Sequence, residues 1–140
     1  MRSIALYGIA VLLLVVVLIA VIGAALPEKH TASRSVTIAL PPDALFRLLT
    51  EIKFGDVPVR IERQESPSLL VTRVDGTDLP YGGTWTYRIA PAPGGSTLTI
   101  TEDGEVHNVI FRFMSRFILG HYATLDAYIA HLLRHTKGTP

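Results

Sequence analysis

The 140-residue chain contains no cysteine, which excludes disulfide bonds, thiol catalysis and thiolate metal sites. It also has no G-x-S-x-G motif, no phosphate-binding glycine loop and no H-E-x-x-H motif. Ser115 has no evident general base in the sequence, so nucleophilic catalysis has no support. We therefore assign no catalytic residue and expect no cofactor.

An excess of charge of either sign is also missing. The 13 lysine and arginine residues are nearly balanced by 12 acids, and neither sign is gathered into a stripe. A nucleic-acid partner needs a basic face, because most of the affinity comes from contacts with phosphates. We therefore expect no nucleic-acid partner.

The longest stretch without charge runs from Ile4 through Leu26. About 23 residues at about 1.5 Å each make a helix of about 34 Å, enough to cross the hydrocarbon core of a bilayer. We predict a single transmembrane anchor at residues 1–26, with the membrane as a partner. A cleaved signal peptide is the alternative, although its apolar core usually has only about 7–15 residues.

The charges that flank this anchor do not fix its orientation. Arg2 precedes it, and Lys29 and Arg34 follow it, so the positive-inside rule is nearly balanced. A very short N-terminal tail most simply stays in the cytoplasm. This favours an extracytoplasmic position for the rest of the chain.

One small α+β domain is predicted for residues 35–136, after a polar linker at 27–34. Alternation of polar and apolar residues indicates strands, and helical spacing indicates a short helix after Pro41 and a long one from Asn108. Gly120 interrupts the apolar face of the long helix, so we expect a bend or break there. The strands are expected at 35–40, 57–65, 69–74, 84–90 and 97–101, in an antiparallel sheet that packs on the long helix.

Three segments resemble the START-like helix-grip superfamily, in particular its membrane-anchored members of the polyketide cyclase/dehydrase and lipid-transport (SRPBCC) type. They are RSVTIALPPDALFRLL, GGTWTYRI and TLTITEDGEVHNVIFRFMSRFILGHYATLDAYIAHL, which together cover most of residues 32–135. The resemblance implies a curved antiparallel sheet that grips the long helix, with an apolar cavity between them.

The chain departs from this family pattern after the first helix of the domain. About thirty residues of the pattern, including a further pair of strands, are absent between Thr50 and Asp56. The sheet should therefore have about five strands and less width to wrap a ligand. An open groove, a collapsed cavity and a domain completed by a protein partner all remain open.

Alternation places side chains of two neighbouring strands on the face that should look at the helix. Ordinary core packing explains the aromatic and aliphatic ones equally well. The acid among them, Glu102, either faces a ligand or lies solvated in a turn over 102–105. The candidate ligand-binding residues are Trp85, Tyr87, Leu98, Ile100, Glu102 and His121.

The remaining histidines give weaker signals. His107 and His121 could form an acid/base pair, although surface histidines are commoner. His131 and His135 are one helical turn apart, but two ligands do not make a zinc site, so no metal is expected.

Two arginines one turn apart, Arg112 and Arg116, lie among phenylalanines. They either face lipid headgroups, with the aromatic rings at the membrane interface, or form ion pairs with the acids at 102–105.

These observations leave three hypotheses. The first is non-catalytic binding of an apolar small molecule or lipid, and it predicts an apolar cavity without an organised acid/base pair. The second is a cyclase or dehydratase-like enzyme, in which Glu102 and a histidine converge inside the cavity. The third is a protein-interaction module with a filled core and an exposed strand edge.

Overall fold

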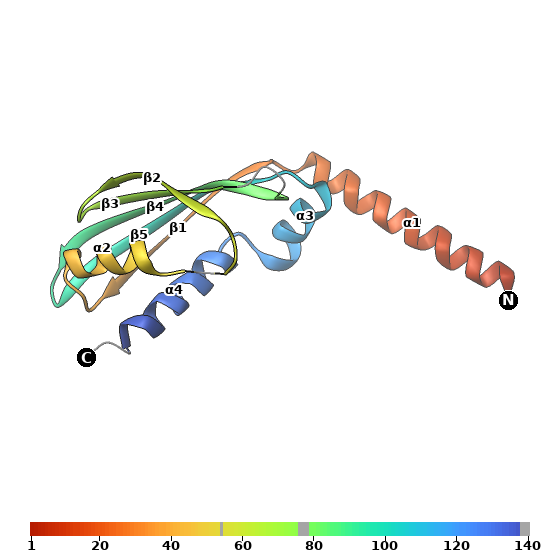
Figure 1. The fold of residues 1–140 in the computed structure, drawn as a ribbon. Helices are drawn as coiled ribbons and strands as arrows, with labels where there is room; N and C mark the ends of the chain where they lie inside the picture. The colour runs from red at the N-terminus through yellow and green to blue at the C-terminus, as the bar shows by residue number, and fades with distance from the viewer. Residues whose placement is uncertain (54, 76–78, 138–140) are drawn as a thin grey trace.

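The computed structural model describes residues 1–53, 55–75 and 79–137, and it has the predicted α+β architecture. A five-stranded antiparallel sheet, in the order β1-β5-β4-β3-β2, carries helices on one face (Figure 1). The elements are α1 (Arg2–Ala25), β1 (Lys29–Ile38), α2 (Pro42–Glu51), β2 (Val59–Glu65), β3 (Leu69–Val74), β4 (Tyr81–Ala92), β5 (Gly95–Val106), α3 (Val109–Met114), the single π-helical turn η1 (Ser115–Leu119) and α4 (Ala123–Lys137).

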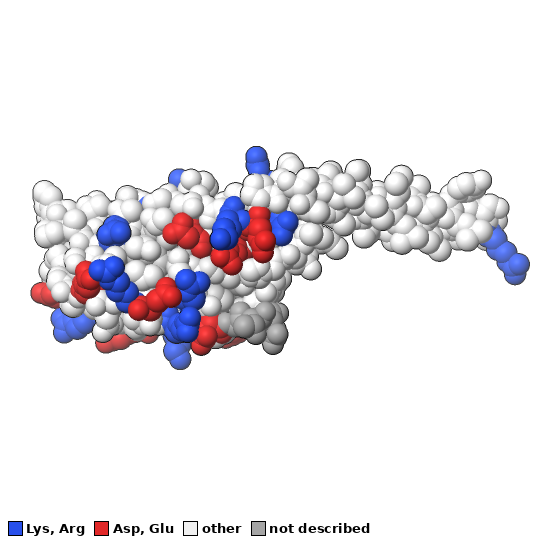
Figure 2. Space-filling model, turned by 90° about the horizontal axis from the view of Figure 1, so that it is seen from above, with Lys and Arg blue, Asp and Glu red and all other residues white. Residues whose placement is uncertain are grey.

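The N-terminal helix α1 leads away from the domain (Figure 1). Its most apolar 18-residue window has a mean hydropathy of 3.2, and none of that window is buried in the protein. The helix is thus long and apolar enough to cross a membrane. Figure 2 shows acidic and basic side chains crowded on the domain, whereas α1 is uncharged along most of its length.

Local signals place the helix boundaries as expected. Pro42 occupies the first turn of α2, where the missing N–H of proline costs nothing. The Asn108 side chain accepts hydrogen bonds from the backbone N–H groups of Ile110 and Phe111, both at 3.0 Å, and so caps α3. Gly120 has a φ of 77°, which favours glycine, and it separates η1 from α4. The predicted break in the C-terminal helix is confirmed.

Three strands are longer than the sequence indicated; β4 spans Tyr81–Ala92 instead of 84–90, and the other two are β1 and β5. β1 already begins at Lys29, so most of the expected linker is strand, and β5 continues to Val106 through the expected turn at 102–105. The two strands pair continuously from Lys29–Glu105 to Ile38–Ser96. Each strand satisfies the backbone groups of the other, and this pairing outweighs the weak strand propensity of the charged residues.

The hydrophobic core lies at the end of the sheet remote from α1. There Val36 of β1 and Ile89 of β4 both lie opposite Leu98 of β5, and Ile38 belongs to the same buried cluster. Leu45 of α2 and Leu132 of α4 join the same buried cluster. The two helices therefore close this end of the sheet.

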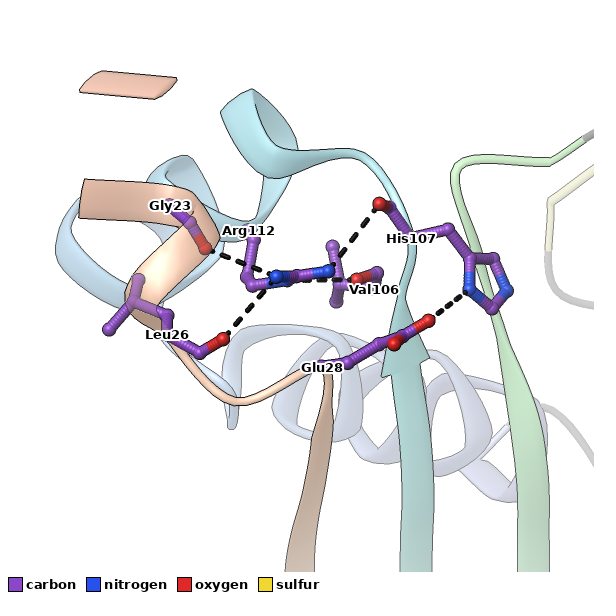
Figure 3. A network of polar contacts seen from close by, with 6 residues as sticks. All are labelled: Gly23, Leu26, Glu28, Val106, His107 and Arg112. Carbon is purple, nitrogen blue, oxygen red and sulfur yellow. Dashed lines mark hydrogen bonds and ion pairs between the residues drawn. The ribbon is translucent and has the colours of Figure 1, made fainter. Parts of the chain in front are cut away.

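The end of the domain nearest α1, here called the near end, is joined to that helix by Arg112 (Figure 3). Its guanidinium donates hydrogen bonds to the carbonyl oxygens of Gly23 and Leu26 at 3.2 and 3.3 Å, and to that of Val106 at 3.1 Å. The first two belong to the end of α1, where carbonyl groups lack partners within the helix. A cation there also complements the helix dipole.

A close backbone contact tightens this junction. A Cβ added to Gly23 would lie 1.9 Å from the carbonyl oxygen of Val109, so only glycine permits α3 to approach α1 this closely. Beside it, Glu28 accepts a hydrogen bond from His107 at 2.9 Å, and this bond lowers the pKa of Glu28.

Candidate functional site

A cavity of about 920 Å³ lies at the end of the domain nearest α1. Its walls are the inner face of the sheet, residues 52, 53 and 55–59 between α2 and β2, the segment α3–η1, and the first turns of α4. The described residues between α2 and β2 therefore form one wall of an open cavity. The sheet has five strands, as predicted.

Small residues create the space. At the core end, β4 and β5 face inward with Ile89 and Leu98, whereas the corresponding positions at the near end are Gly83 and Gly104. A Cβ on Gly104 would lie 2.3 Å from the Cε1 atom of the His30 ring. Glycine at this position thus leaves the room that the imidazole occupies.

A polar cluster lines the same end of the cavity. His30 Nε2 lies 2.8 Å from Glu102 Oε1, and the side chains are only 17% and 13% exposed. The ring of His121 stacks on that of His30, with 4.3 Å between the ring centroids and 23° between the planes. The cluster combines a carboxylate, the imidazole it orients and a second imidazole, and all three line the cavity.

The surroundings of His121 favour its neutral form. Burial lowers the pKa of His121, and the neighbouring charges of His30 and Arg116 lower it further, against an opposing effect of Glu102. Its buried Nδ1 atom has no hydrogen-bond partner among the described residues. This nitrogen can donate or accept a hydrogen bond, according to the tautomer of the ring.

Aromatic rings separate the cavity from the core. Trp85 meets Tyr128 edge-on at 5.3 Å between ring centroids, and Tyr87 lies 5.8 Å from Tyr128. Burial raises the pKa of both tyrosines, so they stay neutral in water at ordinary pH. They give the cavity an apolar floor with a few hydroxyl groups.

The candidate residues divide between the two ends of the sheet. Trp85, Tyr87, Glu102 and His121 line the cavity. Leu98 and Ile100 lie fully buried in the core and are not among the cavity residues. The expectation of a solvated turn at Glu102 is wrong, since this residue lies within β5, opposite Trp85 of β4.

His30 is the site residue that sequence reasoning missed, because it was assigned to the linker. A signal was present, since His30 and Ala32 continue the alternation of Val36 and Ile38 backwards along the chain. The length of the partner strand could not be recognised from the sequence. Without it, this extension looked like an ordinary polar segment.

The other histidines lie elsewhere. His107 contacts Glu28 and does not meet His121, so the suggested pair between these two histidines does not form. His131 Nε2 lies 3.0 Å from the carbonyl oxygen of Lys53, and His135 Nδ1 lies 2.9 Å from that of His131. The described residues contain no group of three or more side chains that could hold a metal ion.

The expected ion pair of Arg112 with the acids at 102–105 does not form. Its guanidinium instead donates to backbone carbonyls at the end of α1 and of β5 (Figure 3). Arg116 is exposed, with its guanidinium 5.5 Å above the ring of Phe117.

Neither a protein-family model nor a curated protein sequence matches the chain. Solved structures do. An uncharacterised protein from Rhizobium leguminosarum superposes with a TM-score of 0.58 at 11% identity, over 80% of this chain and 97% of that one.

Two further structures share the fold. CalU16 from Micromonospora echinospora has a TM-score of 0.57 at 12% identity, over 81% of this chain and 85% of its own. Ara h 8.0201 has a TM-score of 0.53 at 12% identity, over 79% and 96%. At this level of identity the likeness concerns the fold alone, and it agrees with the helix-grip arrangement that the sequence resemblance implies.

Proposed function

We propose that the protein is a membrane-anchored, START-like binding protein for an amphipathic small molecule or lipid. The observation that carries this proposal is the cavity of about 920 Å³ between sheet and helices. Small-molecule sites commonly enclose about 300–1,000 Å³, with mostly apolar walls and a few convergent polar groups. The helix α1 would hold the domain on the extracytoplasmic face of the bilayer, next to a source of apolar ligands.

The lining suggests how such a ligand would lie. Its apolar body would rest on Trp85 and Tyr87, and each Å² removed from water would contribute roughly 25 cal/mol. A hydroxyl, carbonyl or carboxyl group would reach the cluster of His30, Glu102 and His121. Such a group would satisfy the His121 nitrogen that has no partner among the described residues.

Native mass spectrometry of the detergent-solubilised full chain tests this proposal. We expect the wild-type protein to retain one apolar molecule from cellular lipid. The variant Gly104→Leu, which fills the cavity end, should lose that molecule. Lipid that merely coats α1 would remain on both proteins, and equal retention by the two would contradict the proposal.

The pair of His30 and Glu102 favours a second function, because a carboxylate that orients an imidazole is a common general-base arrangement. In this case His30 would accept a proton from the bound molecule, as in a cyclase or dehydratase-like reaction. Incubation of the retained ligand with the protein in deuterated water separates the two functions. An unchanged ligand supports binding alone, whereas deuterium incorporation that His30→Gln abolishes supports catalysis.

The third hypothesis required a filled core, and the large cavity argues against it. β2 is nevertheless an edge strand with every residue exposed. A protein partner on this edge remains compatible with ligand binding.

A further inference from the structure

Apolar side chains are exposed on the segment that connects the sheet to α4. Outside residues 1–25, the exposed large apolar residues of the described chain fall into two groups, one in β2 and a larger one in residues 110–122. They are Val59 and Ile61 in the first group and Ile110, Phe117, Ile118, Leu119 and Tyr122 in the second. Exposure of such an apolar cluster to water is unfavourable, and clusters of this kind mark interaction surfaces.

The position of this segment indicates its partner. α3 and η1 lie at the end of the domain from which α1 leaves (Figure 1). α3 contacts α1 through Val109 at Gly23, two residues before the end of the 24-residue helix. Such a helix is about 36 Å long, against a hydrocarbon core of about 30 Å. Gly23 would therefore lie at the depth of the headgroups when α1 spans a bilayer.

The charge of the segment fits the same partner. No acid occurs between His107 and Leu125, whereas Arg112 and Arg116 are both present. Arg112 is used to fasten α3 to the end of α1, and Arg116 is exposed beside Phe117. A long arginine side chain can rest its stem on apolar surface while its charge reaches anionic headgroups.

We propose that α3 and η1 form a second membrane contact, a cavity lip that lies in the interface of the same bilayer that α1 crosses. This inference rests on the proposed anchoring by α1. One side of the lip faces inward, since Phe111 stacks on Tyr81 with 5.8 Å between centroids, and both line the cavity. The other side carries Phe117 and Ile118 outward. The cavity mouth would then open at the depth where apolar ligands reside.

Because the chain has no cysteine, single nitroxide labels can test this directly. The full chain carrying Ile118→Cys is labelled and reconstituted in vesicles of phosphatidylcholine and phosphatidylglycerol. Ile61→Cys is the matched control, because Ile61 is an equally apolar and comparably exposed side chain in β2, at 50% against 63%. The measurement compares two collision rates of the label. One is with oxygen, which dissolves in the bilayer, and the other is with a water-soluble nickel chelate.

We expect the ratio of oxygen to nickel collisions to be several-fold higher at residue 118 than at residue 61. Equal ratios would overturn the proposal. A label at 118 that is shielded from both reagents would overturn it too, because it would mark contact with a second copy of the chain. Phe117→Cys, a second exposed position, repeats the measurement if the first label perturbs the fold.

Flotation of the vesicles, measured first, distinguishes this proposal from the anchoring on which it rests. A chain that does not float with vesicles contradicts the anchor and the lip together. A chain that floats while the label at 118 remains in water contradicts the lip alone. Ligand retention is read independently of both by mass spectrometry.

Discussion

The two ends of the sheet's inner face differ, although the same three strands build both. At the far end β1, β5 and β4 contribute Ile38, Leu98 and Ile89 to a core closed by α2 and α4. Toward α1 the same strands contribute His30, Gly104, Glu102 and small neighbours, which leave an open cavity. The residues that stabilise the fold and the residues of the candidate site thus lie at opposite ends of the strands. Substitutions at one end should therefore affect stability, and substitutions at the other should affect ligand binding.

The largest effect is expected from truncation at the closed end. Leu98 is fully buried, and Leu98→Ala should lower the free energy of unfolding by about 2–5 kcal/mol through lost burial and a new void. Leu119→Ala, at the exposed rim of the cavity, should change it by less than about 0.5 kcal/mol. Denaturant unfolding in detergent, followed by the fluorescence of the single tryptophan, measures both. Equal losses would show that the two ends form one packing unit.

The converse substitution adds volume at the open end. Gly104→Ala would push the His30 ring away from Glu102, so ligand retention should fall by about tenfold, the effect of losing about 1.4 kcal/mol of interaction. Stability should change little, because the displaced group is a side chain that can turn toward solvent. Gly82→Ala is the matched control, since its added methyl group would keep an ordinary 3.4 Å contact with His107. Competition with a labelled ligand gives the affinities.

The closed end was predictable from the sequence, and the open end was so only in part. Alternation in TWTYRIA and TLTIT, together with Pro41 and Asn108 as helix starts, fixes the strands, the helices and the side chains that face inward. Leu98 and Glu102 share one alternating face, but periodicity cannot tell which of these positions is covered by helices. Whether a position is covered depends on how α2, α4 and residues 55–59 pack against the sheet.

The polar cluster depended on pairing over a long sequence separation. His30 and Glu102 are 72 residues apart, and they meet because β1 and β5 pair in one register. Charged and polar residues there have low strand propensity, so a prediction from local sequence begins β1 too late and ends β5 too early. The strand pairing that overrides this preference is a tertiary effect, and only the structure reveals it.

A third prediction sharpens the comparison at the rim of the cavity. Phe117→Asp combined with Ile118→Asp should slow uptake of ligand from vesicles several-fold, because two carboxylates would draw the lip out of the anionic interface. The unfolding free energy should stay nearly unchanged, since both side chains are already exposed. Val59→Asp with Ile61→Asp is the control, and stopped-flow transfer of a fluorescent lipid measures the rates. Equal slowing by both pairs would indicate a general charge effect.

The smallest expected effect is a pH dependence confined to the open end. The pKa of His121 is lowered, chiefly by burial, from its ordinary value of about 6.5. Between that value and the lower pKa of the folded protein, the unfolded chain binds more protons, so the free energy of unfolding falls as pH falls. Below the lowered pKa both states are protonated and the decline stops. His121→Asn should flatten unfolding free energies across this window, whereas His107→Asn, outside the cavity, should retain the slope that His121 causes. An unchanged slope in the His121 variant would mean that acid acts on the closed end as well, and the two ends would then titrate as one.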